Sequence, residues 1–278
     1  MKILFFGFLA ISVACVQKED KKQVDDTAVN VAAPYIWGDQ AFPKAIQISD
    51  DFSAAEMANI TDMGEAWESA LQNKKDFFSF GPRTPEISNT IGSLDDMYDS
   101  VLGIYKTTQW PADISGSALA VTQIFGRRHN VGTGDEYVNI EHADIFINTD
   151  IHIFDTADSG PGYDLRTVVL HEMGHFLGLQ HKEYNFPRDQ SVMFPSIFSY
   201  ESKRAPKTTD INDIASKYGI ALGGGGAVAA SVSDADSPQY KPKDAGQSVK
   251  VLIELHSDGN CLHKVDGATV GHHQVKLK

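Results

Sequence analysis

The chain has 278 residues, a formal net charge of −13 at pH 7, a sequence pI of about 5.1 and 42% hydrophobic residues. This length allows one large domain with or without appendages, and the hydrophobic content is sufficient for a core. No run of basic residues could follow a phosphate backbone, so we do not expect nucleic acid as a partner. Two cysteines, Cys15 and Cys261, do not predict a disulfide framework.

Residues 1–15 (MKILFFGFLAISVAC) have the pattern of a secretory signal peptide. Lys2 supplies the positive start, and the apolar run after it is too short to span a membrane. Cys15 directly follows Ser-Val-Ala, which resembles the lipobox of bacterial lipoproteins, although Ser12 stands where leucine is usual. We expect an exported protein attached to the cell envelope, as an outer-membrane lipoprotein, through a lipid on Cys15. The alternative is a freely secreted protein cut nearby.

Residues 16–33 are polar and mixed in charge, which is typical of a flexible tether or a short propeptide. The globular part is predicted for residues 34–220. It begins with a strand and a long helix that Ser53 can cap, and this helix runs through Leu71 with apolar residues at helical spacing. The predicted strands, taken in order, are 44–49, 76–80, 101–107, 118–122 and 137–148. This order predicts an α+β fold with a twisted, mixed, five-stranded sheet.

The stretch from His171 to His181 reads HEMGHFLGLQH and follows a helix start that Asp164 can cap. His171 and His175 are one helical turn apart, so both imidazoles lie on one face and can bind the same Zn²⁺. Gly178 can end the helix in the left-handed conformation and let His181 return as a third ligand. Three protein nitrogens leave a fourth position for water, as in catalytic zinc sites, and the neighbouring Glu172 can act as the base.

The spacing H-E-x-x-H-x-x-G-x-x-H, followed by Ser-Val-Met-Phe-Pro at residues 191–195, resembles the signature of metzincin zinc peptidases. Met193-Phe194-Pro195 is similar to the turn of the matrixin branch. Astacins and serralysins carry a tyrosine where Pro195 stands. Lys182 departs from the small polar residue that matrixins often have after the third histidine. The resemblance implies a metzincin fold with one antiparallel edge strand, a long N-terminal helix, an active-site helix and a C-terminal helix.

The resemblance also implies roles for further residues. Met193 would form an apolar floor beneath the metal without binding it. The substrate, an extended protein or peptide, would add a strand to the sheet edge, which by chain order comprises Ala118, Leu119, Ala120, Val121 and Thr122. A strand buried within the sheet is the alternative for this segment. An apolar pocket for the residue after the scissile bond would be lined by Thr167, Phe194, Pro195, Ser196 and Ile197.

Other metal sites and partners are less defined by the sequence. The pairs Asp95–Asp96 and Asp155–Asp158 are candidate Ca²⁺ ligands, with solvated loop carboxylates as the alternative. His129, His142 and His152 match no compact ligand set, so we expect surface or hydrogen-bonded histidines. Within the tether, Asp25 or Asp26 is a candidate cap for the zinc. We expect a monomer.

The chain ends with three further segments. Residues 208–210 (Thr-Thr-Asp) can cap a last helix that Gly219 ends. Residues 221–230 are glycine-rich and predict a flexible linker. The remainder to residue 278 contains strand-like alternation, which predicts either a small β-appendage or a mostly disordered tail.

These patterns predict an exported zinc-dependent endopeptidase with one catalytic Zn²⁺. One alternative is a non-catalytic envelope lipoprotein that uses a metzincin scaffold for binding or adhesion. Another is an astacin-like or snapalysin-like enzyme, against which Met193-Phe194-Pro195 argues.

Overall fold

The computed structural model describes residues 33–38, 42–87, 93–157, 160–182, 186–223, 240–258 and 260–274. The predicted signal peptide, the tether up to residue 32 and Cys15 lie outside these ranges, as do most of the predicted glycine-rich linker and Asp158. Within the described ranges, no helix has the length and apolar composition needed to cross a membrane.

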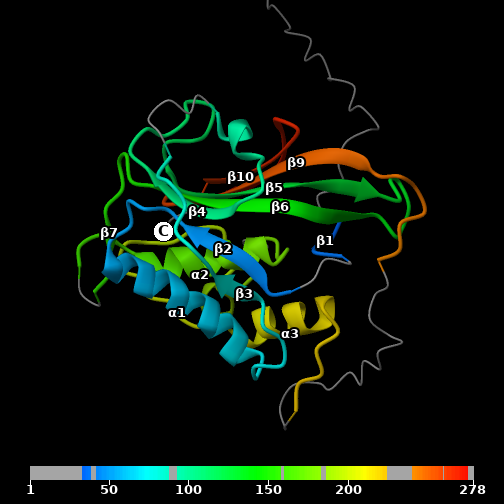
Figure 1. The fold of residues 1–278 in the computed structure, drawn as a ribbon, viewed down its shortest axis with the longest axis horizontal. Coiled ribbons are helices and arrows are strands. Elements are labelled where there is room, and N and C mark those ends of the chain that lie inside the picture. Colours follow the sequence, from blue (N-terminus) through cyan, green and yellow to red (C-terminus); the bar gives the residue numbers. More distant parts are fainter. Residues whose placement is uncertain are drawn as a thin grey trace, which may run out of the picture.

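One mixed sheet organises the described part of the chain (Figure 1). Its strands follow one another in the order β11-β10-β9-β5-β6-β4-β2-β3, and the short β1 pairs with β6. The strands are β1 (Tyr35–Ile36), β2 (Lys44–Ile48), β3 (Phe78–Phe80), β4 (Leu102–Thr107), β5 (Ala118–His129), β6 (Tyr137–Asn148), β9 (Gln247–His256), β10 (Asn260–Val265) and β11 (Ala268–Gln274). A separate pair joins β7 (Phe154–Asp155) to β8 (Tyr163–Asp164).

The three α-helices are α1 (Ala54–Ala70), α2 (Leu165–Phe176) and α3 (Thr208–Lys217), and short 3-10 turns occupy 94–97 and 188–190. The side chain of Ser53 caps α1 and that of Asp164 caps α2, as predicted. Helix α3 begins at Thr208 rather than after Asp210. The Asp210 carboxylate instead accepts a hydrogen bond from the backbone N–H of Lys207, 2.9 Å away, inside the first turn. Figure 1 shows α1 and α2 together on one side of the sheet.

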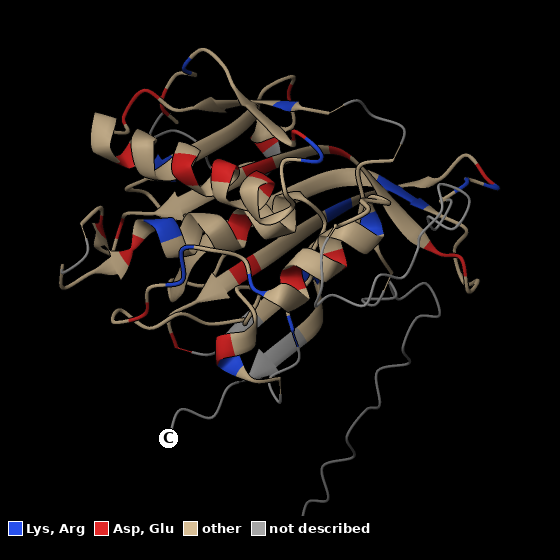
Figure 2. Ribbon diagram, turned by 90° about the horizontal axis from the view of Figure 1, so that it is seen from below, with Lys and Arg blue, Asp and Glu red and all other residues tan. Residues whose placement is uncertain are grey.

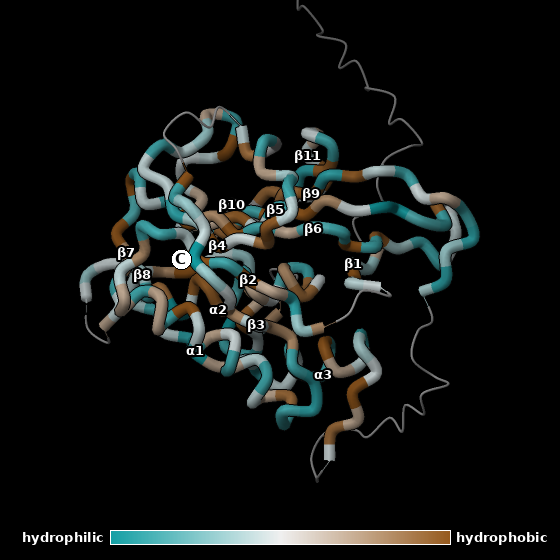
Figure 3. Tube along the Cα trace, viewed as in Figure 1, coloured by the Kyte–Doolittle hydropathy of each residue, from teal (hydrophilic) through white to brown (hydrophobic). Residues whose placement is uncertain are grey.

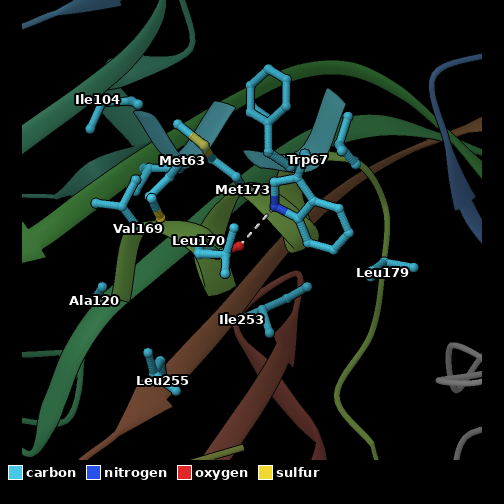
Figure 4. Packing of buried hydrophobic residues seen from close by; sticks show 14 of the residues in the cluster. Met63, Trp67, Ile104, Ala120, Val169, Leu170, Met173, Leu179, Ile253 and Leu255 are labelled. Atoms are coloured by element: carbon cyan, nitrogen blue, oxygen red, sulfur yellow. Dashed lines mark hydrogen bonds between the residues drawn. The ribbon is translucent and has the colours of Figure 1, made fainter. Parts of the chain in front are cut away.

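The main core lies between this helical layer and the sheet. Trp67 of α1 is fully buried, and its indole Nε1–H donates to the carbonyl of Leu170 in α2 at 3.0 Å (Figure 4). Trp37 makes the equivalent bond to the carbonyl of Phe176 at 2.7 Å. Hydrophobic segments concentrate in α2 and the strands beside it, whereas the projecting ends of β5 and β6 are more hydrophilic (Figure 3). Two indole bonds therefore fix the register of α2 on its neighbours.

The α+β architecture is confirmed, with the five predicted strands in the order β3-β2-β4-β6-β5 and with β5 antiparallel to β6. Two details differ. Strand β5 continues to His129, well past the predicted end at residue 122, because the backbone stays paired with β6 beyond the bulge at Gly126. The segment 118–122 is also not an open edge, since β9 pairs with the outer side of β5.

The C-terminal segment is built into the same sheet and core. Val249, Val251, Ile253 and Leu255 of β9 are buried in the main cluster with residues of α1 and α2. Figure 4 places Ile253 and Leu255 beside Leu170 and Ala120. The sequence left a small β-appendage and a mostly disordered tail as alternatives for this region. The described residues form β-strands, and these strands continue the sheet of the larger domain.

Charged residues occur on helices, strands and loops, and a few of them, such as Asp144, Asp210 and Glu254, are buried. Figure 2 shows Asp and Glu recurring along helices and loops, with fewer Lys and Arg interspersed among them, some on the same elements. This distribution is consistent with the net charge of −13.

Replacing Trp67 with alanine removes a fully buried ring and its bond to α2. We expect a loss of about 3–5 kcal/mol in the free energy of unfolding, measured by urea denaturation of the full chain. Tyr200 is 79% exposed, so Tyr200→Ala should change stability by less than about 0.5 kcal/mol. Equal losses in the two variants would contradict the packing described here.

Candidate metal centre

Helix α2 carries the first two candidate ligands and the candidate base. Asp164 caps the helix by accepting from the backbone N–H of Thr167 at 3.0 Å, and Arg204 forms an ion pair with the same carboxylate at 2.6 Å. The cap anchors the start of a helix whose residues 167–176 are all buried. His171, Glu172 and His175 are thereby held inside the protein, each 0% exposed.

The chain then reverses at Gly178, whose φ of +84° lies in the left-handed region. Its N–H donates to the carbonyl of His175 at 2.8 Å, and the following Leu179 donates to Gly174 at 2.8 Å. A β-carbon at Gly178 would collide with the carbonyl oxygen of Tyr35, so glycine is required here for two reasons. The turn brings His181 back toward the helix, as the sequence predicted.

The three Nε2 atoms converge on one point. His171 and His175 are separated by 2.9 Å, and each lies 3.0 Å from Nε2 of His181. The other ring nitrogen of His171 donates to the carbonyl of Val192 at 2.7 Å, and that of His175 donates to the carbonyl of Leu179 at 2.8 Å. A carbonyl can only accept, so Nδ1 carries the proton in both rings and Nε2 presents a lone pair.

These residues fit a Zn²⁺ ion. Converging lone pairs repel one another unless a cation lies between them, and a tetrahedral zinc with bonds of about 2.0–2.1 Å separates its nitrogens by roughly 3.3 Å. Burial lowers the pKa of His171 to about 3, and burial followed by the neighbouring His171 lowers the pKa of His175. Both imidazoles are therefore neutral at physiological pH, which is the form that binds a metal.

Glu172 stands beside this cluster with its two oxygens in different surroundings. Oε2 accepts a hydrogen bond from the hydroxyl of Thr122 at 2.6 Å. Oε1 is buried and has no hydrogen-bond partner among the described residues, which leaves it available to a water or a substrate group. Burial raises the pKa of Glu172 to about 8, against the opposing effect of the Thr122 bond. A nearby cation would lower this pKa and favour the carboxylate form.

Met193 packs against the helix that carries the first two candidate ligands. It is fully buried, and a β-carbon at Gly174 would collide with its sulfur, so the thioether lies against the last turn of α2. The turn is held by Asp210 of α3, which accepts from the Ser191 hydroxyl and, at 2.9 Å, from the N–H of Val192. The carbonyl of Val192 in turn accepts from His171. Asp210 thus positions a metal ligand through the backbone of the turn.

The predicted substrate-binding residues are buried in this structure. Ala118, Leu119, Ala120, Val121 and Thr122 are each 0% exposed, between β6 and β9. The segment 194–197 is also buried. Neither set borders an open cleft, because the C-terminal strands cover this side of the protein.

Thr167 does not have the predicted position in a pocket. Its hydroxyl donates to Asp164 at 2.6 Å and accepts from the N–H of Lys203 at 2.7 Å. These bonds place the side chain in the cap of α2. Thr167 lies one helical turn before His171, and the prediction placed it in the pocket for that reason. Its hydroxyl instead belongs to the hydrogen-bond network that caps α2.

The three histidines before α2 have hydrogen-bond partners, as expected. His142 bonds Asp144 at 2.7 Å, His129 bonds Asp244 at 3.0 Å and His152 lies 3.1 Å from the carbonyl of Gly116. In the described part of the chain, His171, His175 and His181 form the one group of three metal-ligating side chains with converging ligand atoms. No converging group of carboxylates among the described residues supports the calcium hypothesis. The carboxylate of Asp155 accepts a hydrogen bond from the backbone N–H of Gly162.

Two contacts to this centre were not foreseen from the sequence. Thr122 was assigned only to substrate binding, yet its side chain holds Glu172. His263 of β10 places Nε2 2.8 Å from Nδ1 of His181, so the third candidate ligand is contacted by the C-terminal segment. Four histidines follow residue 255, and no spacing in the sequence singles out His263 among them.

The family model described as Matrixin matches residues 58–219, which is more than half of the chain. The chain therefore belongs to the matrixin family, whose members are zinc-dependent endopeptidases, and the metzincin resemblance is confirmed. A search of curated proteins found no match.

Replacing His175 with alanine removes one of the three converging nitrogens, so we expect loss of stoichiometric zinc from the purified protein, measured by inductively coupled plasma mass spectrometry. His152→Ala is the matched control, because His152 lies outside the cluster and should keep one zinc per chain. Full occupancy in the His175 variant would remove this residue from the ligand set.

Proposed function

We propose that the protein is an endopeptidase that hydrolyses peptide bonds of extended protein substrates with a water activated at the three-histidine centre. The observation that carries this proposal is the convergence of three Nε2 atoms next to a buried carboxylate oxygen with no partner among the described residues. His171, His175 and His181 would hold one Zn²⁺, which when bound supplies a Lewis acid and a water whose pKa is lowered toward about 7.

The chain's own groups would perform the proton transfers. Glu172 is anchored through Oε2 by Thr122, which fixes the direction of the remaining oxygen. Oε1 would accept a proton from the attacking water and deliver it to the leaving amine nitrogen. The full burial of this carboxylate supports the role, because a charge in a dry site interacts strongly with the reacting atoms.

Substrate would be recognised mainly through its backbone. Residues 118–122 provide the peptide groups of β5, and residues 194–197 lie across from them beyond β9. A peptide bound between these segments would be held extended by main-chain hydrogen bonds, which tolerate many sequences. Phe194 and Ile197 are apolar, which favours a hydrophobic side chain after the scissile bond.

Glu172→Ala should retain one zinc per chain and lose at least about 100-fold in kcat/KM, since general-base catalysis contributes roughly 10²–10⁴-fold. Cleavage of a peptide library, with products identified by mass spectrometry, measures the loss. Glu65→Ala is a control of the same charge change, because Glu65 is exposed on α1 and takes no part in the centre or in the segments assigned to substrate. Undiminished cleavage by the Glu172 variant would sink the mechanism. Absence of cleavage by every zinc-loaded form would favour a binding scaffold instead.

We also propose that the protein is exported and lipidated at Cys15. The support is the sequence of residues 1–15 alone. In a bacterial host, radiolabelled palmitate should enter the wild-type protein, and Cys15→Ala should release the chain from the membrane fraction. Cys261→Ser is the matched control and should remain labelled. Equal labelling of the Cys15 variant and the wild type would contradict lipidation at this residue.

A further inference from the structure

Strand β9 occupies the outer side of β5 along most of its length. The two strands are antiparallel, with Ala118 opposite His256 at one end and Arg128 opposite Gln247 at the other. The pairing spans the segment 118–122 assigned to substrate, with a register shift at Leu119. Figure 1 shows β9 beside β5 on the side away from β6, and β10 pairs with the far edge of β9. The backbone groups that an incoming peptide would use are therefore already paired within the chain.

The opposite edge of β9 meets the segment after the Met193 turn. Ser196 and His256 form a parallel bridge, and the N–H of Ile197 donates to the carbonyl of His256 at 3.2 Å. His256, the last residue of β9, thus lies between β5 and residues 196–197 and contacts both through main-chain groups, whereas residues 251–253 of β9 pair with β10 on that edge. An extended peptide bound in the proposed cleft would take this same place and these same bonds.

Side chains of the C-terminal strands also reach the metal centre. Thr122 is opposite Ile253, and Ile253 is opposite His263, so the three side chains share one face of the sheet. Thr122 on that face bonds Glu172 at 2.6 Å, and His263 bonds His181 at 2.8 Å. Figure 4 shows Ile253 against the core beside α2. Residues 253 and 263 therefore cover the centre directly.

The centre is closed in consequence. His171, Glu172 and His175 are 0% exposed, and His263 is 2% exposed. A cavity of about 340 Å³ reaches His181 from the side of Gly178 and Lys182, but Glu172 does not line it. A site that cleaves a protein strand must admit that strand to both the metal and the base, and this arrangement does not.

We propose that residues 247–274, which form β9, β10 and β11, are an intramolecular inhibitor that occupies the substrate cleft in the manner of a bound strand. This inference rests on the proposed endopeptidase function. Cleavage then requires β9 to leave β5, after which the freed edge accepts the substrate. A tethered strand competes at an effective concentration of about millimolar or higher, so substrates at lower concentration are excluded while it stays docked.

A disulfide that locks β9 onto β5 tests the proposal in the full chain. Gln123 and Leu252 are directly opposite one another, next to the Thr122–Ile253 pair but on the other face of the sheet. Both line a cavity of about 110 Å³, so the smaller cysteines fit. The double variant Gln123→Cys/Leu252→Cys is made with Cys261→Ser, and mass spectrometry confirms the bridge.

The zinc-loaded double variant is compared in its oxidised and reduced forms by two readouts. One is binding of a peptide hydroxamate, which measures access to the metal without turnover, and the other is peptide cleavage. Oxidation should weaken hydroxamate binding and slow cleavage by at least about tenfold, and a phosphine reductant should restore both. Leu252→Cys alone, treated identically, should not respond. Equal hydroxamate binding by both forms would overturn the proposal. If hydroxamate affinity depends on oxidation but neither form cleaves peptide, the result supports β9 as a cover of the metal centre and contradicts the endopeptidase function.

A second pair of variants weakens docking without a crosslink. Ile253→Pro interrupts the ladder in the middle strand β9, whereas Thr269→Pro places the same residue at an exposed position of the outer strand β11. The Ile253 variant, with zinc content verified, should bind the hydroxamate at least about tenfold more tightly than the wild type. Thr269→Pro should bind it as the wild type does. A folded, zinc-loaded Ile253 variant with unchanged affinity would reject the inhibitor.

Discussion

The convergence of three imidazole nitrogens within 3.0 Å of one another is the constraint on which the rest of the structure depends. Nitrogen lone pairs repel one another at this distance, and the other ring nitrogen of each histidine has a hydrogen-bond partner that fixes the ring. His171 is held by the Val192 carbonyl and His175 by the Leu179 carbonyl. Both carbonyls belong to turns, so the centre requires those turns to be fixed.

Two buried groups fix them. Gly178 adopts a φ of +84° where a side chain would strike the Tyr35 carbonyl, and this sets the position of Leu179. Asp210 accepts hydrogen bonds at the turn before Met193, and burial raises its pKa above the ordinary value against the effect of those bonds. A carboxylate so enclosed stabilises one backbone conformation strongly, because few alternatives satisfy its oxygens. Helix α3 thereby contributes to a metal site that it does not touch.

The sequence predicts those features whose functional side chains lie within a few turns of one another in the chain. Helical spacing decides that His171 and His175 meet, and Gly178, three residues later, marks the turn that returns His181. The caps at Ser53 and Asp164 are local signals of the same kind. The fold class also followed from the order of strands and helices, together with the family resemblance.

Long-range pairing could not be predicted in this way. Nothing in the alternation of residues 249–255 states that the partner is β5, more than a hundred residues earlier. The contact between His263 and His181 spans 82 positions, and Thr167 was misplaced because its bonds to Asp164 and Lys203 depend on tertiary structure. This difference matters for function, because the linear motif predicts the metal site, whereas the pairing of β9 with β5 determines whether a substrate can reach it.

X-ray absorption spectroscopy at the zinc edge of the purified full chain tests the three-histidine centre directly. We expect three imidazole nitrogens at about 2.0–2.1 Å and no sulfur ligand at about 2.3 Å. A zinc shell containing thiolate, or one with fewer than three imidazoles, would contradict the assignment of His171, His175 and His181 as the metal centre.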